Sequence, residues 1–88
     1  MSDASFRYRA AVLNDLARHG ISPTARTSPQ LVRDFVRELY KYEIRGLKGR
    51  MLRHAFPREE YASRVDALRR QYPVLALLPQ QFLEEGGR

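Results

Sequence analysis

The sequence predicts an all-α fold: a small three-helix domain with a long central helix and a short apolar C-terminal tail. Apolar residues recur at helical spacing in three segments. No segment shows the strand alternation bounded by hairpin turns. Pro23 and Pro57 separate the three segments, and Pro73 ends the third, because proline disfavours helix in the residue before it. The 88 residues are enough for one domain, residues 1–88, and too few for two.

The first helix is expected over residues 5–18. Asp3 or Ser5 can cap its N-terminus by accepting hydrogen bonds from free backbone N–H groups. Gly20 stands where a left-handed residue often closes a helix. The apolar stripe of this helix consists of Phe6, Ala10, Leu13 and Ala17, widened by Val12 and Leu16.

The second helix is expected over residues 28–54, after the linker 20–26. Thr27 and Gln30 form one possible capping box; alternatively, Ser28 caps the helix and Pro29 takes its first position. We expect one broad face to cover the core, and it contains Leu31, Val32, Phe35, Val36, Leu39 and Tyr42. Farther along, Ile44, Leu47 and Met51 turn away from this face. Gly46 and Gly49 lie at the same place, which predicts a bend or the close approach of another backbone.

The third helix is expected over residues 58–72. Tyr61, Val65, Leu68 and Tyr72 form its core stripe. Ion pairs at helical spacing are expected on its outer side, namely Glu60–Arg64, Asp66–Arg69 and Asp66–Arg70. The tail, residues 73–88, is apolar and interrupted by Pro79, so it has room only for short helical turns.

No residue pattern in the chain indicates catalysis, a metal site or a cofactor site. Cysteine is absent, which excludes disulfides and thiol nucleophiles. His19 and His54 each follow arginine at a helix end, where a cation is favourable for structural reasons. Glu59 and Glu60 are neighbours on a helix and point about 100° apart, so they form no acid–base pair. We therefore expect a protein that is not an enzyme and needs no cofactor or metal.

Positive charge marks one face of the second helix. The formal net charge is +6, which favours acidic partners. Five cations follow helical spacing or lie near the same azimuth: Arg33, Arg37, Lys41, Arg45 and Lys48. They form either a solvated outer face or a strip that binds phosphates or an acidic protein surface.

Two groups of apolar residues are candidates for binding a protein partner. The first follows the glycines of the second helix, with a tyrosine at the boundary between the apolar and basic faces: Tyr40, Ile44, Leu47 and Met51. The second lies in the tail: Leu75, Leu77, Leu78 and Phe82. The tail residues either close the core of their own domain or dock on a partner or a second copy.

The tripeptide Leu39-Tyr40-Lys41, with Arg45 one turn later, resembles the L-Y-R/K tripeptide of small basic three-helix accessory proteins of mitochondrial respiratory complexes and iron–sulfur assembly. In that family the tripeptide opens the first helix. Here a whole helix and a linker precede it, so the resemblance carries no functional residue to this chain.

These observations favour a non-catalytic accessory or adaptor subunit that docks on a larger protein or forms a homo-oligomer. The alternative is a protein that binds nucleic acid non-specifically through the basic strip. The longest apolar run, Val74–Leu78, is far too short to span a membrane, and the N-terminus contains no apolar run of signal-peptide length. We therefore expect a cytoplasmic location.

Overall fold

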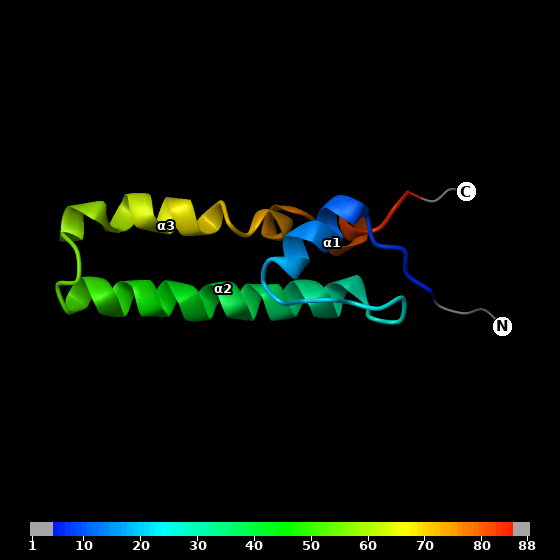
Figure 1. The fold of residues 1–88 in the computed structure, drawn as a ribbon, viewed down its shortest axis with the longest axis horizontal. Helices are drawn as coiled ribbons and strands as arrows, with labels where there is room; N and C mark the ends of the chain where they lie inside the picture. The colour runs from blue at the N-terminus through cyan, green and yellow to red at the C-terminus, as the bar shows by residue number, and fades with distance from the viewer. Residues whose placement is uncertain (1–4, 86–88) are drawn as a thin grey trace.

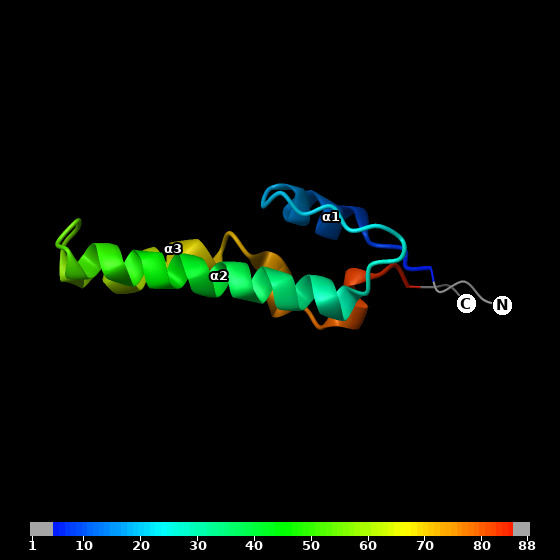
Figure 2. The same cartoon turned by 90° about the horizontal axis from the view of Figure 1, so that it is seen from below.

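The computed structural model describes residues 5–85 and confirms the all-α fold class, with a long central helix. Helices α2 (Pro29–Leu52) and α3 (Tyr61–Arg69) run side by side as a hairpin (Figure 1). Helix α1 (Ala10–Ala17) lies on one side of this hairpin, near the N-terminus of α2 (Figure 2). Three short 3₁₀ helices complete the fold: η1 (Arg58–Glu60), η2 (Pro73–Ala76) and η3 (Pro79–Phe82).

Helix α2 begins as the second of the two sequence alternatives predicts. The Ser28 side chain accepts a hydrogen bond from the backbone N–H of Leu31, and Pro29 takes the first helical position. The helix continues through Gly46 and Gly49 to Leu52 without interruption. It ends two residues earlier than expected, because His54 adopts a left-handed conformation with φ of 64°.

Helix α1 is shorter than expected, and the predicted start at residue 5 is wrong. Residues 5–9 are extended, and Tyr8 forms an antiparallel bridge with Leu83 of the tail. The Arg9 N–H donates to Phe82 O at 2.9 Å, so tertiary pairing replaces the first helical turns. Ser5 therefore caps nothing, and Asp3 lies outside the described residues. Gly20 closes the helix with φ of 77°, as predicted.

Helix α3 also forms, preceded by η1 and ended three residues before the predicted boundary at residue 72. All three expected ion pairs are present: Glu60–Arg64, Asp66–Arg69 and Asp66–Arg70. Three members of its predicted stripe, Tyr61, Val65 and Leu68, are half-buried against α2. The stripe prediction is therefore confirmed.

The main core, called the proximal cluster, lies at the end of the hairpin where α2 begins. Segments far apart in the sequence meet there: the N-terminal strand-like segment, α1, the first half of α2 and the tail. Its buried residues are Tyr8, Val12, Leu16, Val32, Val36, Tyr72, Val74 and Phe82. The tail thus closes the core of its own chain.

A second core, called the distal cluster, lies near the closed end of the hairpin. It contains only three buried residues, Leu47, Met51 and Phe56, with Tyr61, Val65 and Leu68 packed against them. Only α2, α3 and the turn between them contribute to it. The distal half of the molecule is therefore a two-helix hairpin with a thin core.

Candidate partner-binding surface

Three of the five cations predicted to form a binding strip are engaged within the molecule. The Arg33 guanidinium donates to the backbone oxygens of Leu77 and Leu75, both at 2.8 Å, and so holds the tail on α2. Arg37 pairs with Asp34 at 3.2 Å. Lys41 pairs with Glu38 at 3.5 Å. The N-terminal part of the strip therefore has structural contacts that sequence reasoning missed.

The remaining two cations belong to a more strongly charged half of α2. Residues 44–53 hold four cations and no acid, whereas residues 29–43 hold three cations and three acids. Within residues 5–85 none of the four cations forms an ion pair: Arg45, Lys48, Arg50 and Arg53. The free positive charge is thus concentrated on the distal half of the molecule.

The apolar residues predicted to bind a partner on α2 lie largely inside the hairpin. Leu47 and Met51 are 4% and 9% exposed and belong to the distal cluster. Ile44 and Tyr40 are half-buried, and the Tyr40 ring meets the Tyr72 ring edge-on at 5.4 Å. In this conformation these side chains stabilise the fold and offer little surface to another protein.

Most of the tail residues predicted to bind a partner are also covered by their own chain. Phe82 is fully buried, and Leu75 and Leu77 pack against the proximal cluster. Only Leu78, at 56% exposed, faces solvent. Of the tail's four predicted contact residues, Leu78 alone is available to a partner.

The apolar surface that the structure leaves open lies elsewhere on α2. Leu31, Phe35 and Tyr42, here called the apolar stripe, are 62%, 57% and 68% exposed. The sequence pattern predicts all three in the core, and this prediction is wrong. Val32 and Val36, one position farther on, face the core instead. The signal was present in the spacing 31, 35, 42, which is a helical stripe of its own.

A shallow hollow adjoins the N-terminal end of the apolar stripe. The linker residues Ile21, Ser22 and Pro23 form one side of it, and Leu31 and Phe35 form the other. Loop and helix therefore present a continuous, mostly apolar surface, of the kind that buries well against a protein.

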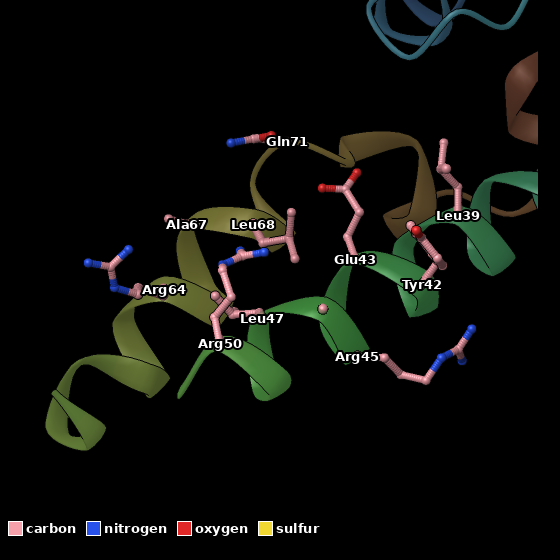
Figure 3. Close-up of a pocket in the computed structure, with 11 residues that line it drawn as sticks. Leu39, Tyr42, Glu43, Arg45, Leu47, Arg50, Arg64, Ala67, Leu68 and Gln71 are labelled. Atoms are coloured by element: carbon pink, nitrogen blue, oxygen red, sulfur yellow. The ribbon is translucent and has the colours of Figure 1, made fainter. Parts of the chain in front are cut away.

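A second open hollow lies between α2 and α3 (Figure 3). Arg45 and Arg64 line it but direct their guanidinium groups away from it (Figure 3). Arg64 pairs with Glu60 at 2.9 Å and lies over the Phe56 ring, 4.2 Å from its centroid. The cations around this hollow do not converge on one point, as a site for a small anion requires.

A polar network joins α1, α2 and the end of α3 at the edge of the proximal cluster. The Tyr72 hydroxyl donates a hydrogen bond to Glu43. The His19 ring stacks on Tyr72 with centroids 4.2 Å apart. Burial, and then the hydrogen bond and charge of Glu43, raise the pKa of Tyr72 far above its usual value. The raised pKa keeps the hydroxyl protonated, so it can go on donating to Glu43, and the network holds three segments of the chain together.

No known protein family, curated protein or solved structure matches this chain. None of the helices in the described part of the chain has the length and apolarity needed to cross a bilayer. Within residues 5–85 no three histidine, aspartate or glutamate side chains gather as metal ligands.

Proposed function

We propose that this protein is a non-catalytic accessory or adaptor subunit that docks through the apolar stripe of α2 on another protein chain, which is either a larger protein or a second copy of itself. The observation that carries the proposal is the exposure of Leu31, Phe35 and Tyr42 along one line of the helix. Leu31 and Phe35 are one turn apart, and Tyr42 follows two turns later on the same line of the helix. Large apolar side chains grouped on one exposed line mark interaction surfaces more often than scattered apolar residues do.

Two further features support docking on a protein. The hollow formed by Ile21 and Pro23 beside Phe35 gives the patch a concave part, which can receive a side chain of the partner. Tyr42 combines a large apolar ring with a hydroxyl, and tyrosine is enriched at protein interfaces for that reason.

The test is affinity capture from the source cells with matched variants. In the variant Leu31→Lys/Phe35→Lys, both changed side chains are already more than half exposed, so the fold is retained and partner binding is lost. The control is Leu13→Lys, which makes the same change on an α1 residue that is 38% exposed and lies outside both predicted contact groups. A protein captured by the wild type and control but not by the double variant supports the proposal. Equal capture by all three contradicts it.

A second candidate function, non-specific binding of nucleic acid, is favoured by the distal positive charge. Arg45, Lys48, Arg50 and Arg53 are free to contact phosphates. Such binding weakens with salt, with a log–log slope of about −0.9 per phosphate contacted. Arg45→Glu/Lys48→Glu should abolish it, whereas Arg37→Glu, at a cation already paired with Asp34, should weaken it less. Weak, salt-independent binding would reject this function.

A further inference from the structure

The exposed face of α2 has the spacing of a coiled-coil seam. Its positions are separated by alternating steps of four and three residues, the spacing at which one helix packs along another. This face, called the seam, consists of Leu31, Phe35, Glu38, Tyr42, Arg45, Gly49 and Leu52. All of these residues are exposed except Gly49, which is half-buried.

We propose that the seam pairs with the seam of a second copy of this chain, with the two α2 helices antiparallel and crossing near residues 38–42. The inference rests on the proposed function, since it names the protein that covers the apolar stripe. The length of α2 allows it: 24 residues extend over about 36 Å, and the seam follows most of that length.

The distribution of charge along α2 selects the antiparallel orientation. Residues 44–53 hold four cations and no acid, and residues 29–43 have equal numbers of both. Parallel pairing would place the two cationic halves side by side and Glu38 against Glu38. Antiparallel pairing places each cationic half against the half that holds Asp34 and Glu38, which is favourable.

The seam residues then meet in complementary pairs. Leu31 of one copy lies over Gly49 of the other, so a large side chain faces a position with none. Phe35 meets Arg45, an arrangement in which a guanidinium can lie on an aromatic ring. Glu38 meets Tyr42, whose hydroxyl can donate to the carboxylate. Each pair occurs twice, because the arrangement is two-fold symmetric.

An ion pair beside the seam adds to this complementarity. Asp34 and Lys48 occupy the same flank of the seam, and antiparallel pairing brings Asp34 of one copy to Lys48 of the other. The two Lys41 side chains, one from each copy, face each other at the two-fold axis. Each is already paired with Glu38 of its own chain at 3.5 Å. The flank is therefore attractive at both ends and largely neutralised in the middle.

The glycines of α2 support the close approach of a second helix. Each costs about 1 kcal/mol relative to alanine in a helix interior. A methyl group at Gly46 would meet only the flexible Arg50 side chain, at 3.7 Å, and one at Gly49 only that of Arg53, at 3.2 Å. Among the described residues, no backbone packs on either glycine. Packing within one chain therefore leaves both glycines unexplained, whereas a second copy over Gly49 explains one of them.

Exchanging the charges of Asp34 and Lys48 tests this pairing, and sedimentation equilibrium measures the dimer dissociation constant. The wild type is expected to have twice the 10.3 kDa chain mass at high micromolar concentration. Lys48→Asp should raise the dimer dissociation constant about tenfold, because both symmetric ion pairs become repulsive. Adding Asp34→Lys should restore it to within about twofold. Asp34 and Lys48 lie fourteen residues apart, or roughly 21 Å along one helix, so restoration requires contact between chains.

A distance measurement tests the orientation. The chain contains no cysteine, so Gln30→Cys carries a single spin label. In the antiparallel pair, residue 30 of one copy lies beside residue 50 of the other, which separates the two labels by roughly 30 Å; a parallel pair brings them much closer. A monomeric wild type, a short label distance or a failed charge swap would each overturn the inference. A monomer that still captures a different protein through Leu31 and Phe35 would leave the proposed function intact.

Discussion

The proximal and distal ends of the α2–α3 hairpin differ in how they are stabilised. At the proximal end, segments far apart in the sequence bury eight residues together, and Arg33 holds the tail on α2. At the distal end, two helices and a turn bury three residues. Because burial of apolar area is the main stabilising term, most of the folding free energy resides at the proximal end.

The two ends also differ in how their positive charges are used. The proximal half of α2 uses its cations in hydrogen bonds and ion pairs within the chain, and the distal half leaves its cations free. The two halves of one helix therefore differ in role: the cations of the proximal half help to close the fold, and those of the distal half stay exposed. The following predictions test that difference, beginning with the largest expected effect.

Removing a large side chain from the proximal cluster should be the most destabilising change. Phe82 is fully buried, and a phenylalanine-to-alanine change in a core costs about 3–5 kcal/mol. Phe82→Ala should therefore lower the unfolding free energy by that amount. The measurement is a urea titration followed by circular dichroism. Leu78→Ala, at a tail residue that is 56% exposed, is the control and should change the unfolding free energy little. Equal losses for the two variants would place the tail outside the core.

A matching change in the distal cluster should cost less. Leu47→Ala should lower the unfolding free energy by about 2 kcal/mol, the low end for core leucines, because few buried neighbours surround it. Amide hydrogen exchange should show the distal turns of α2 and α3 opening before the proximal end in the wild type, and more so in the variant. Uniform exchange along α2 would show that the two ends unfold as one unit.

Removing the Arg33 side chain should free the tail. Arg33→Ala leaves the carbonyls of Leu75 and Leu77 without their donor, at a cost of about 1–2 kcal/mol. Arg37→Ala, four residues later, removes a surface ion pair and should cost less than about 0.5 kcal/mol. Hydrogen exchange in residues 75–83 should rise only in the first variant. If both variants behave alike, Arg33 does not anchor the tail.

High pH should weaken the proximal end through Tyr72. The folded state raises the pKa of this hydroxyl above its unfolded value of about 10. The protonated form is thus favoured by folding, and its stabilisation is complete below pH 10 and declines as the pH rises above it. Tyr72→Phe should cost about 1 kcal/mol at neutral pH and flatten the decline above pH 10. An unchanged alkaline profile in this variant would assign the decline to other groups.

Local signals in the sequence were enough to predict the fold class, the start of α2 at Ser28 and Pro29, and the left-handed Gly20, because each depends on residues close in the chain. The extended segment 5–9 was not predictable in this way, since its conformation depends on pairing with the distant tail at Leu83.

The exposed apolar surface of α2 was predicted less well for a related reason. Two apolar stripes lie next to each other on α2, one through Phe35 and one through Val36. Periodicity alone does not decide which stripe the rest of the chain will cover. Likewise, the sequence predicts Arg33 as a surface cation, whereas in the structure it donates to backbone carbonyls of the tail. Contacts with distant parts of the chain determine which stripe is buried and what Arg33 binds, and the spacing of residues along α2 does not reveal those contacts.

Neighbouring positions on α2 provide the most direct test of the division between the core face and the proposed binding face. Val36 is fully buried and Phe35 is 57% exposed. Val36→Ala should lower the unfolding free energy by about 2 kcal/mol, whereas Phe35→Ala should change that of the monomer by less than about 0.5 kcal/mol and weaken association. The measurement is the unfolding free energy of both variants at concentrations too low for association. A loss for Phe35→Ala as large as that for Val36→Ala would contradict the account.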